Sequence, residues 1–372
     1  MASKKEKIKP RVLFITRCYP PAVGGMERFA KDLHDALAKE TDQVTLSWGG
    51  SKKALIFVLP YFFIKSCLIV ARNNIEVIHA QDGVVSIFAT LVGKLFKKPV
   101  VVVIHGLDAT YSNGLYQYLI RHSLKRSERI ICISQAAKDE VVKRGINSRN
   151  VVVIPLGMTD ELFDKTILKK QINEVVHDLP ENPKILLSVG RLVKRKGIVW
   201  FLNNVMPEII KKESSSILVV CGKGPEKEEI EKAIKSLKIS KNVRLIGSVT
   251  DEQLKILYNS ADCFVMPNIP VAGDMEGFGR VLLEAALCEL PVVASDLEGI
   301  KEAITNNKNG ILCTPEDSQA HSRTIIGILR DKSGAKLLGS RARQYTLKNY
   351  SWPLIAQHYL DQYTSLIQKD TK

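Results

Sequence analysis

Short apolar runs alternate along the chain with longer amphipathic stretches. The runs have the length and the β-branched content of buried strands, and the stretches between them have the length of helices. Apolar strands joined by crossover helices are typical of a parallel sheet with helices on both faces. The pattern therefore predicts an α/β protein with strands in the segments 11–16, 43–48, 76–80, 100–106, 129–134, 150–155, 184–190, 216–222, 242–247, 263–267, 291–295 and 310–314.

One polar stretch interrupts this alternation. Residues 164–183 read DKTILKKQINEVVHDLPENP, and their prolines are typical of a linker. A chain of 372 residues is long enough for two domains. We therefore expect two Rossmann-like, doubly wound parallel-sheet domains, at 1–180 and 181–345, that face a central cleft. Ligands of such folds bind in the crevice at the carboxyl ends of the strands.

The last residues of the chain, 346–372, predict helices whose apolar positions need a packing partner. Two arrangements are open. The helices can pack back across the domain boundary onto the N-terminal domain, or they can form a simple terminal pair.

Residues 54–71, ALIFVLPYFFIKSCLIVA, are apolar over a length that suggests a membrane span. Pro60, Lys65 and Ser66 lie inside this stretch. It also falls between two predicted strands, where a crossover helix is required, and a true span would disrupt the sheet. A largely buried crossover helix is one interpretation, and a helix with one face on the membrane surface is another.

The composition, with 45% hydrophobic and 25% charged residues, is that of an ordinary globular protein. The seven cysteines are scattered and never form a C-x-x-C pair, which favours free thiols in a reducing compartment over a zinc site. The basic N-terminal residues are followed by the apolar run VLFI, which is too short for a signal peptide. We expect a cytoplasmic protein.

The net charge of +15 is unevenly distributed. Residues 1–180 hold 27 Lys and Arg against 17 Asp and Glu, and the remaining residues hold 27 against 22. Such a field attracts polyanions. No nucleic-acid motif is present, and the aromatic residues are not interleaved with basic clusters, so we expect no nucleic-acid partner. As the anionic partner of the N-terminal domain, we favour the inner face of the cytoplasmic membrane over nucleic acid, through a peripheral contact.

The stretch GDMEGFGRVLLEA places Glu276 and Glu284 eight positions apart. Residues 280–288 predict a helix with one buried face, so that Glu276 precedes the helix and Glu284 lies one turn inside it. Gly277 and Gly279 allow a tight turn before the helix. The free N–H groups of the first helical turn favour an anion, and carboxylates accept hydrogen bonds from hydroxyls. This combination suits a sugar nucleotide, and the alternative is an acidic helix start without a ligand.

Two loops of the first half follow predicted strands. The segment YPPAVGGMERFA puts a glycine pair before a helix that begins near Met26, and a helix N-terminus favours an anion. The segment VVVVIHGLDAT ends a strand on His105, with Asp108 just beyond it. A lone histidine is often structural, but ligands of α/β sheets bind at the carboxyl ends of strands. Neither the dinucleotide G-x-G-x-x-G spacing nor a P-loop occurs.

Two loops of the second half complete the set. The segment SVGRLVKRKG follows the first predicted strand of the second domain and carries Arg191 and Lys196 in a cationic run. Such a run is often solvated surface, but at this position its cations can face a diphosphate. The segment CGKGPEKEEI brings Gly222 and Gly224 to another strand end, where a loop can lie against a nucleotide.

The segments GRLVKRKG and EGFGRVLLEA, together with PPAVGGMER, CGKGPE and NVRLIGSV, resemble the family 4 glycosyltransferases, which are retaining enzymes of the GT-B fold. The resemblance covers nearly the full chain. It implies that Arg191 and Lys196 bind the donor diphosphate, that Glu276 approaches the transferred sugar, and that Glu284 approaches the ribose. It also implies His105 near the sugar.

Further contacts are expected around these residues. The donor would be bound by residues of the glycine-containing loops, and Glu27 and Asp108 would contact the acceptor. Arg280 stands where the family often has an aliphatic residue, and a phosphate contact and a surface contact are both open for it. The expected donor-binding set is Gly24, Gly25, Gly190, Arg191, Lys196, Gly222, Gly224, Glu276, Gly277, Phe278, Gly279, Arg280 and Glu284.

The implied reaction moves a hexose from a UDP- or GDP-sugar to a hydroxyl of a glycan or lipid-linked acceptor in cell-envelope glycoconjugate synthesis. Fixed cations would stabilise the departing diphosphate. No D-x-D motif occurs, so we expect no metal and no other cofactor. Glu276 would position sugar hydroxyls, with the leaving phosphate taking the acceptor proton. A nucleotide-sugar epimerase or a phosphorylase on the same fold, and a non-catalytic sugar-nucleotide or membrane-surface binding protein, are the alternatives.

Overall fold

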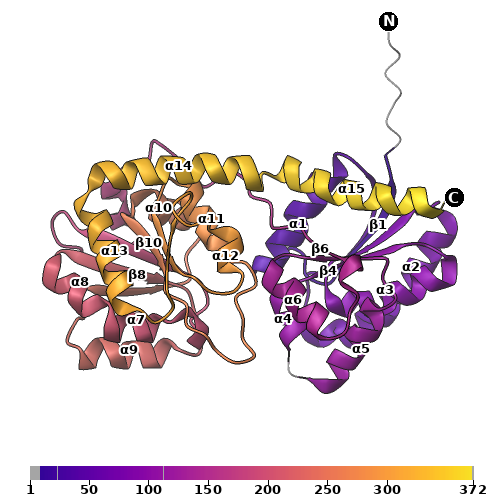
Figure 1. The fold of residues 1–372 in the computed structure, drawn as a ribbon, viewed down its shortest axis with the longest axis horizontal. Coiled ribbons are helices and arrows are strands. Elements are labelled where there is room, and N and C mark those ends of the chain that lie inside the picture. Colours follow the sequence, from indigo (N-terminus) through magenta and orange to yellow (C-terminus); the bar gives the residue numbers. More distant parts are fainter. Residues whose placement is uncertain (1–8, 23, 112, 371–372) are drawn as a thin grey trace, which may run out of the picture. The chain divides into compact units, whose positions relative to one another are not determined.

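The structure is a computed structural model that describes residues 9–22, 24–111 and 113–370 (Figure 1). It divides into two compact units, the first formed by residues up to Gly157 together with those from Tyr350 onward, and the second by Met158–Asn349. Within the described residues each unit holds one six-stranded parallel sheet flanked by helices. Every strand among the described residues overlaps one of the predicted apolar runs, so the predicted doubly wound α/β fold is confirmed.

The sheet of the first unit has the strand order β2-β1-β3-β4-β5-β6. Its strands are β1 (Arg11–Thr16), β2 (Asp42–Ser47), β3 (Val77–Ala80), β4 (Val100–Ile104), β5 (Arg129–Cys132) and β6 (Val151–Val153). Its helices are α1 (Gly25–Ala38), α2 (Leu55–Arg72), α3 (Gly83–Phe96), α4 (Gly106–Thr110), α5 (Gly114–Leu124), α6 (Gln135–Lys143) and α15 (Trp352–Asp370).

The middle strands of this sheet are buried on both faces. All five residues of β4 are buried, and Val102 and Val103, which point to opposite faces, are both 0% exposed. Continuous apolar strands form in this way because helices cover both sides of a parallel sheet.

The C-terminal helix α15 belongs to the first unit and packs against α1. The ring of Trp352 stacks on Phe29 with centroids 5.9 Å apart, and it lies so close to Gly157 that a Cβ there would be 2.3 Å from the indole. Farther along the helix, the Tyr363 hydroxyl and His79 Nδ1 are 2.7 Å apart. These contacts give the apolar positions of α15 their packing partner within the first unit.

Helix α2 is the crossover helix between β2 and β3, and it is long and apolar enough to cross a membrane by length and composition alone. Val58, Phe62 and Ile69 pack into the core of the unit. Only 28% of the helix is buried, however, so the expectation of a largely buried crossover helix is wrong. Only one face of α2 packs against the sheet, and the opposite face is exposed.

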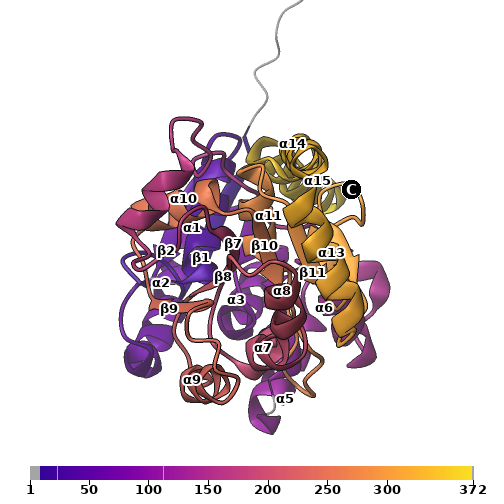
Figure 2. The ribbon, with the colours of Figure 1, turned by 90° about the vertical axis from the view of Figure 1, so that its left-hand side faces the viewer.

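The second unit has the strand order β12-β11-β10-β7-β8-β9. Its strands are β7 (Lys184–Val189), β8 (Ser216–Cys221), β9 (Val243–Gly247), β10 (Cys263–Met266), β11 (Val292–Ser295) and β12 (Ile311–Cys313). Its helices are α7 (Ile198–Asn204), α8 (Met206–Lys212), α9 (Lys227–Ser236), α10 (Asp251–Ser260), α11 (Arg280–Leu287), α12 (Ile300–Ala303), α13 (Ser318–Arg330) and α14 (Lys332–Tyr350). Helices α8 and α13 lie side by side along this sheet (Figure 2).

The start of the segment expected as a linker, 164–183, and the residues just before it pack on the second unit. Asn259 donates to the carbonyl of Leu162 at 2.7 Å and accepts from the N–H of Asp164 at 3.0 Å. Arg343 of α14 binds both carboxylate oxygens of Asp160. The boundary between the units therefore lies at 157/158, before the expected position at 180, because these polar contacts fix the segment to α10 and α14.

The seven cysteines are all free thiols, and six of them are buried. This agrees with the sequence expectation of no disulfides. Burial raises the pKa of the Cys18 and Cys132 thiols to about 12, so they stay protonated at neutral pH.

Candidate active site

The strand order of the second unit reverses between β7 and β10, which lie next to each other. The chain leaves both strands at the same edge of the sheet, in loops that diverge on either side of this switch point. The cationic run at 191–196 follows β7, and the loop that carries Glu276 follows β10. The topology therefore brings two of the predicted segments together.

A short 3-10 turn at Lys194–Lys196 holds the cationic run against the segment after β10. The N–H of Ile269 donates to the carbonyl of Arg195 at 3.0 Å. Gly197 ends the turn with φ 66°, and a Cβ there would be 2.0 Å from the carbonyl oxygen of Pro267. Only glycine fits this conformation and this close approach, and the turn fixes the adjacent Lys196.

Glu276 lies at the centre of a cluster of donors and is 9% exposed. Its Oε2 accepts from Lys196 Nζ at 2.6 Å, from the guanidinium of Arg195, and from Asn268 Nδ2 at 3.3 Å. Arg195 also binds Asp274 at 3.0 Å. All of the recorded side-chain contacts of Glu276 within the described part of the chain end on Oε2, which leaves Oε1 as an acceptor for a ligand.

The electrostatics of the cluster keep Glu276 ionised. Burial alone would raise the pKa of its carboxyl, but the charges of Lys196 and Arg195 outweigh burial and lower the pKa from 4.5 to about 2. Burial lowers the pKa of the Lys196 ammonium, and the negative charge of Glu276 offsets part of that effect. The carboxylate is therefore a hydrogen-bond acceptor at neutral pH and a poor base.

A second carboxylate positions the backbone of the Glu276 loop. Glu298 accepts the N–H of Glu276, and the N–H of Gly299 donates to the carbonyl of Glu276 at 3.1 Å. Glu298 adopts φ 48°, a left-handed conformation that costs on the order of 1 kcal/mol for a residue with a side chain. Burial raises the pKa of the Glu298 carboxyl. This residue is strained where it holds the site.

The glycines at the ends of β7 and β8 interlock. Gly190 and Gly222 have φ 152° and φ 143°, and a Cβ on Gly222 would be 1.9 Å from the carbonyl oxygen of Gly190. A Cβ on Gly224 would be 2.2 Å from the carbonyl oxygen of Leu192. The close approach of the two loops thus explains why glycine, with no Cβ, occupies these positions. The predicted donor contacts of Gly190, Gly222 and Gly224 remain predictions.

Arg191 is exposed, and its guanidinium makes no hydrogen bond or ion pair with any other described residue. It lines the same small cavity as Gly190 and Lys196, and the Lys196 side chain passes over the α-carbon of Gly190. An exposed arginine and a mostly buried lysine thus line one cavity. Such a pair of donors fits an anionic ligand.

Helix α11 begins at Arg280, as predicted, so Glu276 precedes the helix and Glu284 lies inside it. Glu284 has different partners from Glu276. Its Oε1 accepts from Arg280 at 3.1 Å and its Oε2 from the hydroxyl of Tyr258 at 3.0 Å. Phe278 is buried and Gly279 adopts φ 82° at the helix start. The two glutamates of the sequence motif therefore belong to separate hydrogen-bonded groups.

The first unit carries a polar group at its own switch point, between β1 and β3. Arg17 follows β1, and its Nε binds Asp82 Oδ1 at 3.1 Å. Asp82 follows β3 and is 0% exposed, and it also accepts the N–H groups of Val84 and Val85 at the start of α3. Burial would lower the pKa of Arg17, but the negative charge of Asp82 raises it.

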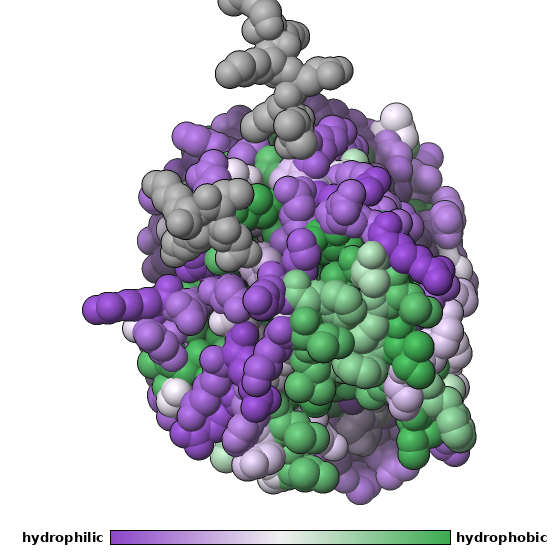
Figure 3. Space-filling view, turned by 90° about the vertical axis from the view of Figure 1, so that its right-hand side faces the viewer, coloured by the Kyte–Doolittle hydropathy of each residue, from purple (hydrophilic) through white to green (hydrophobic). Residues whose placement is uncertain are grey.

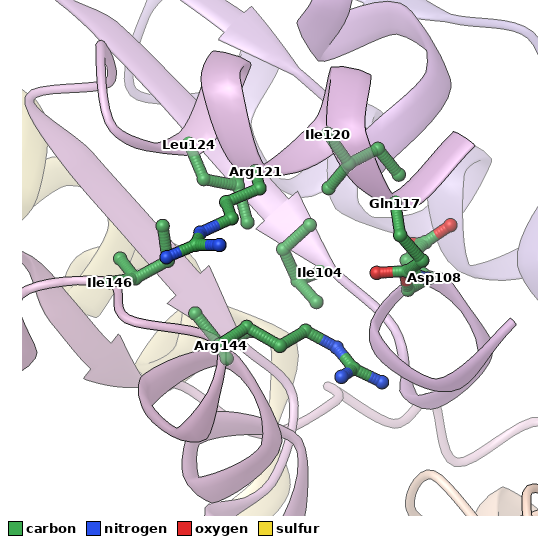
Figure 4. Close-up of a pocket in the computed structure, with 9 residues that line it drawn as sticks. Ile104, Asp108, Gln117, Ile120, Arg121, Leu124, Arg144 and Ile146 are labelled. Atoms are coloured by element: carbon green, nitrogen blue, oxygen red, sulfur yellow. The ribbon is translucent and has the colours of Figure 1, made fainter. Parts of the chain in front are cut away.

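Strand β4 ends at Ile104, so His105 follows it directly, one residue beyond the predicted position inside the strand, and is 8% exposed. Its Nε2 lies 3.2 Å from the carbonyl oxygen of Gln81, and its ring packs edge-on against Phe29. Asp108 accepts the N–H of His105 at 3.1 Å and the hydroxyl of Tyr116 at 3.0 Å. Figure 4 shows Asp108 beside Gln117 at one end of a small cavity into which Arg144 extends. Asp108 thus fixes the turn after β4 in this structure.

Helix α1 begins at Gly25, so the glycine pair spans the helix start, with Gly24 just before it. A Cβ on Gly24 would be 2.3 Å from Oε2 of Glu27, so this carboxylate lies over the helix start. A phosphate at this position requires Glu27 to turn away. The predicted donor contacts of the glycine pair and the predicted acceptor contact of Glu27 remain predictions.

Sequence reasoning missed several residues of these groups. Arg195 was part of the cationic run but had no distinct role, and nothing marked Asn268, Asp274, Glu298 or Arg17. No group of three or more histidine, cysteine, aspartate or glutamate side chains within the described residues has a geometry that could hold a metal ion. The expectation of a metal-free reaction remains a prediction.

Comparisons with known proteins connect these features. The family model of glycosyl transferases group 1 matches residues 169–345, and that of Glycosyltransferase Family 4 matches residues 23–162. An uncharacterized glycosyltransferase of Methanocaldococcus jannaschii is 26% identical over 95% of this chain and 97% of its own length. Glycogen synthase of Mycobacterium tuberculosis is 22% identical over 93% and 92%. The crystal structure of Anabaena HepE in complex with UDP-glucose, 18% identical, has a TM-score of 0.76 over 96% of this chain and 100% of that one.

Proposed function

This chain belongs to the family 4 glycosyltransferases, hexosyltransferases with the GT-B fold of two Rossmann-like domains, and from that premise we propose a reaction. We propose that the enzyme moves a hexose from a UDP-sugar, with retention of configuration and without a metal ion, to a hydroxyl of a glycan or lipid-linked acceptor. Cell-envelope glycoconjugate synthesis at the cytoplasmic side of the membrane is the setting we propose for it.

The cluster around Glu276 carries the proposal. Breaking the bond between sugar and phosphate develops negative charge on the diphosphate and positive charge on the anomeric carbon. Lys196 is fixed at the end of β7 by the turn that Gly197 closes, and Arg191 lines the same cavity. These cations would stabilise the departing diphosphate. One fixed donor of this kind lowers the activation free energy by about 3 kcal/mol.

Glu276 has a separate part in this proposal. Three donors converge on its Oε2, and Oε1 would accept a hydroxyl of the transferred sugar. A carboxyl with a pKa of about 2 is a weak proton acceptor, so Glu276 would not serve as the general base. The departing phosphate oxygen would take the proton of the acceptor hydroxyl, which approaches the same face that the phosphate leaves.

The comparisons with known proteins support the choice of donor and acceptor. The Anabaena protein was crystallised with UDP, and with UDP-glucose, which favours a uridine nucleotide over GDP for a chain of the same fold. The glycan synthesis named for the mycobacterial relative supports a glycan acceptor. The basic N-terminal residues and α2 support an acceptor at an anionic membrane surface, either lipid-linked or part of an anionic glycan.

Calorimetric titration with UDP, GDP and ADP tests the donor. We expect UDP to bind at least about tenfold more tightly than GDP or ADP, in the presence of EDTA. Arg191→Ala and Lys196→Ala should each weaken the binding of UDP, whereas Lys194→Ala, which removes an exposed cation of the same run, should not. Equal binding of the three nucleotides, or no effect of Arg191→Ala and Lys196→Ala, would refute the site.

A further inference from the structure

One face of α2 is a continuous apolar surface. Large hydrophobic side chains on this face recur along the whole helix, and five of them are strongly exposed. They are Ile56 at 71%, Phe57 at 79%, Tyr61 at 56%, Ile64 at 60% and Leu68 at 45%. The opposite face of the helix packs on the sheet and on α3. Figure 3, which looks onto the side of the first unit that carries α2, shows a broad hydrophobic patch.

Neighbouring helices extend this surface. Helices α2, α3 and α5 follow one another in the same layer, with α3 in contact with both of the others. Helix α3 exposes Leu91 at 45% and Leu95 at 65%, and α5 exposes Leu115 at 71% and Tyr118 at 59%. An apolar surface of this extent on a soluble domain marks an interaction site.

A basic groove lies at the C-terminal ends of α3 and α5, beside Leu95. Its cations are Lys94, Lys97, Lys98, Lys125 and Arg126. None of them makes an ion pair with another residue that the structure describes. The single carboxylate in the groove, Glu128, accepts the N–H of Val100 at 2.7 Å. Among the described residues, the groove therefore has an excess of positive charge, with five cations and one carboxylate.

We propose that the outer surface of α2, α3 and α5 docks on an anionic lipid bilayer. In this arrangement α2 lies in the plane of the interface, with its exposed apolar side chains among the acyl chains and the groove cations on the lipid phosphates. The proposal does not depend on the identity of the sugar donor, because the surface shares no residue with the Glu276 cluster.

The charge of this surface favours an anionic bilayer over a second copy of the chain as its binding partner. Helices α2, α3 and α5 contain no aspartate or glutamate along their whole length, whereas Lys65, Arg72, Lys94 and Arg121 lie on them. A second copy of the same surface would bring like charges together, which disfavours a symmetric dimer. A membrane span is excluded by the packing of Val58, Phe62 and Ile69 in the core of the unit.

Flotation of the full chain with vesicles tests the proposal. We expect binding to vesicles of phosphatidylcholine with phosphatidylglycerol, weak binding to phosphatidylcholine alone, and release by high salt. Phe57→Ala with Ile64→Ala should weaken the partition by more than about tenfold. Lys97→Ala with Lys125→Ala should also weaken the partition by more than about tenfold, but only with anionic vesicles. The reason is that each cation near the membrane surface raises the partition onto anionic lipid roughly fivefold.

The variants change exposed side chains, so the fold should persist, and an unchanged urea unfolding transition would show that it does. Matched controls in the second unit are Leu337→Ala, at 59% exposure, and the exposed Lys332→Ala. These controls should bind vesicles like the unaltered protein. Failure of the unaltered protein to bind anionic vesicles would overturn the proposal. So would binding of both double variants to anionic vesicles as tight as that of the unaltered protein, or a concentration-dependent dimer that Phe57→Ala with Ile64→Ala abolishes while vesicle binding persists.

Discussion

At the residue scale, the proposed chemistry depends on how charge is shared around Glu276. One carboxylate faces the ammonium of Lys196 and the guanidinium of Arg195, and all three are mostly buried. Removing one member of such a group leaves an uncompensated charge, which is strongly destabilising, so substitutions that keep the shape are the informative ones.

Glu276→Gln gives a prediction about pH. The pKa of Glu276 is about 2 in the folded state and near 4.5 when unfolded, so its ionisation stabilises the fold above pH 4.5 and this contribution is lost as the pH falls toward 2. The difference in unfolding free energy between the unaltered protein and Glu276→Gln should shrink by about 1 kcal/mol between pH 7 and pH 3.5. Urea denaturation at both pH values measures it. A difference that stays constant would mean that Glu276 is not paired as described.

Some of these residues could be predicted from the sequence and others could not. Lys196 and Glu276 stand in conspicuous segments, a cationic run and a glycine-bracketed turn, and each of these segments follows a strand. Glu298 has no such context, because its contact depends on a left-handed backbone that its neighbours impose. Likewise, the sequence could not reveal that Glu284 pairs with Arg280 and Tyr258, since Tyr258 lies on another helix.

At the scale of elements, the turn at Lys194–Lys196 depends on one glycine. Gly197→Ala should destabilise the protein by at least about 2 kcal/mol, because it adds both φ strain and a clash with Pro267, and it should weaken nucleotide binding by shifting Lys196. Urea denaturation and calorimetry measure the two effects.

The control for this substitution is Gly273→Ala. Gly273 also has a positive φ, of 77°, but a Cβ there would meet nothing within 4 Å, so that only the strain remains. Gly273→Ala should therefore cost less stability than Gly197→Ala. Equal losses in the two variants would show that the close approach to Pro267 does not position the turn.

Helix α15 yields a prediction about stability. Trp352 is 7% exposed and packs on Phe29 and Gly157, so Trp352→Ala should lower the unfolding free energy of the first unit by about 3–5 kcal/mol. His358→Ala removes an exposed side chain of the same helix and should change it by less than about 0.5 kcal/mol. Chemical denaturation of both variants decides this, and a small effect of Trp352→Ala would mean that α15 is not docked on α1.

The elements were the most predictable level of the structure. Strands such as β4 are recognised because five consecutive apolar residues fit only a strand buried on both faces. The exposure of α2 was less predictable, because its mean hydropathy does not show which face the sheet covers. The boundary at 157/158 was missed because the polar contacts of residues 160–164 with α10 and α14 join segments distant in sequence.

At the scale of the whole molecule, we propose different tasks for the two units. The second unit carries the Glu276 cluster at its switch point, and the first carries the basic and apolar surface of α2, α3 and α5. The net charge of +15 suits both tasks, since the proposed donor and the proposed lipid surface are anionic.

The central claim is that fixed cations, and no metal ion, stabilise the departing nucleoside diphosphate. The most direct measurement is the rate of UDP release from a UDP-sugar, with EDTA or with added Mg²⁺ or Mn²⁺. We expect the unaltered enzyme and Lys194→Ala to keep their rate in EDTA. We expect Lys196→Ala to be at least about 100-fold slower under all three conditions. Loss of activity in EDTA that Mg²⁺ or Mn²⁺ restores, with Lys196→Ala as fast as the unaltered enzyme, would contradict this claim.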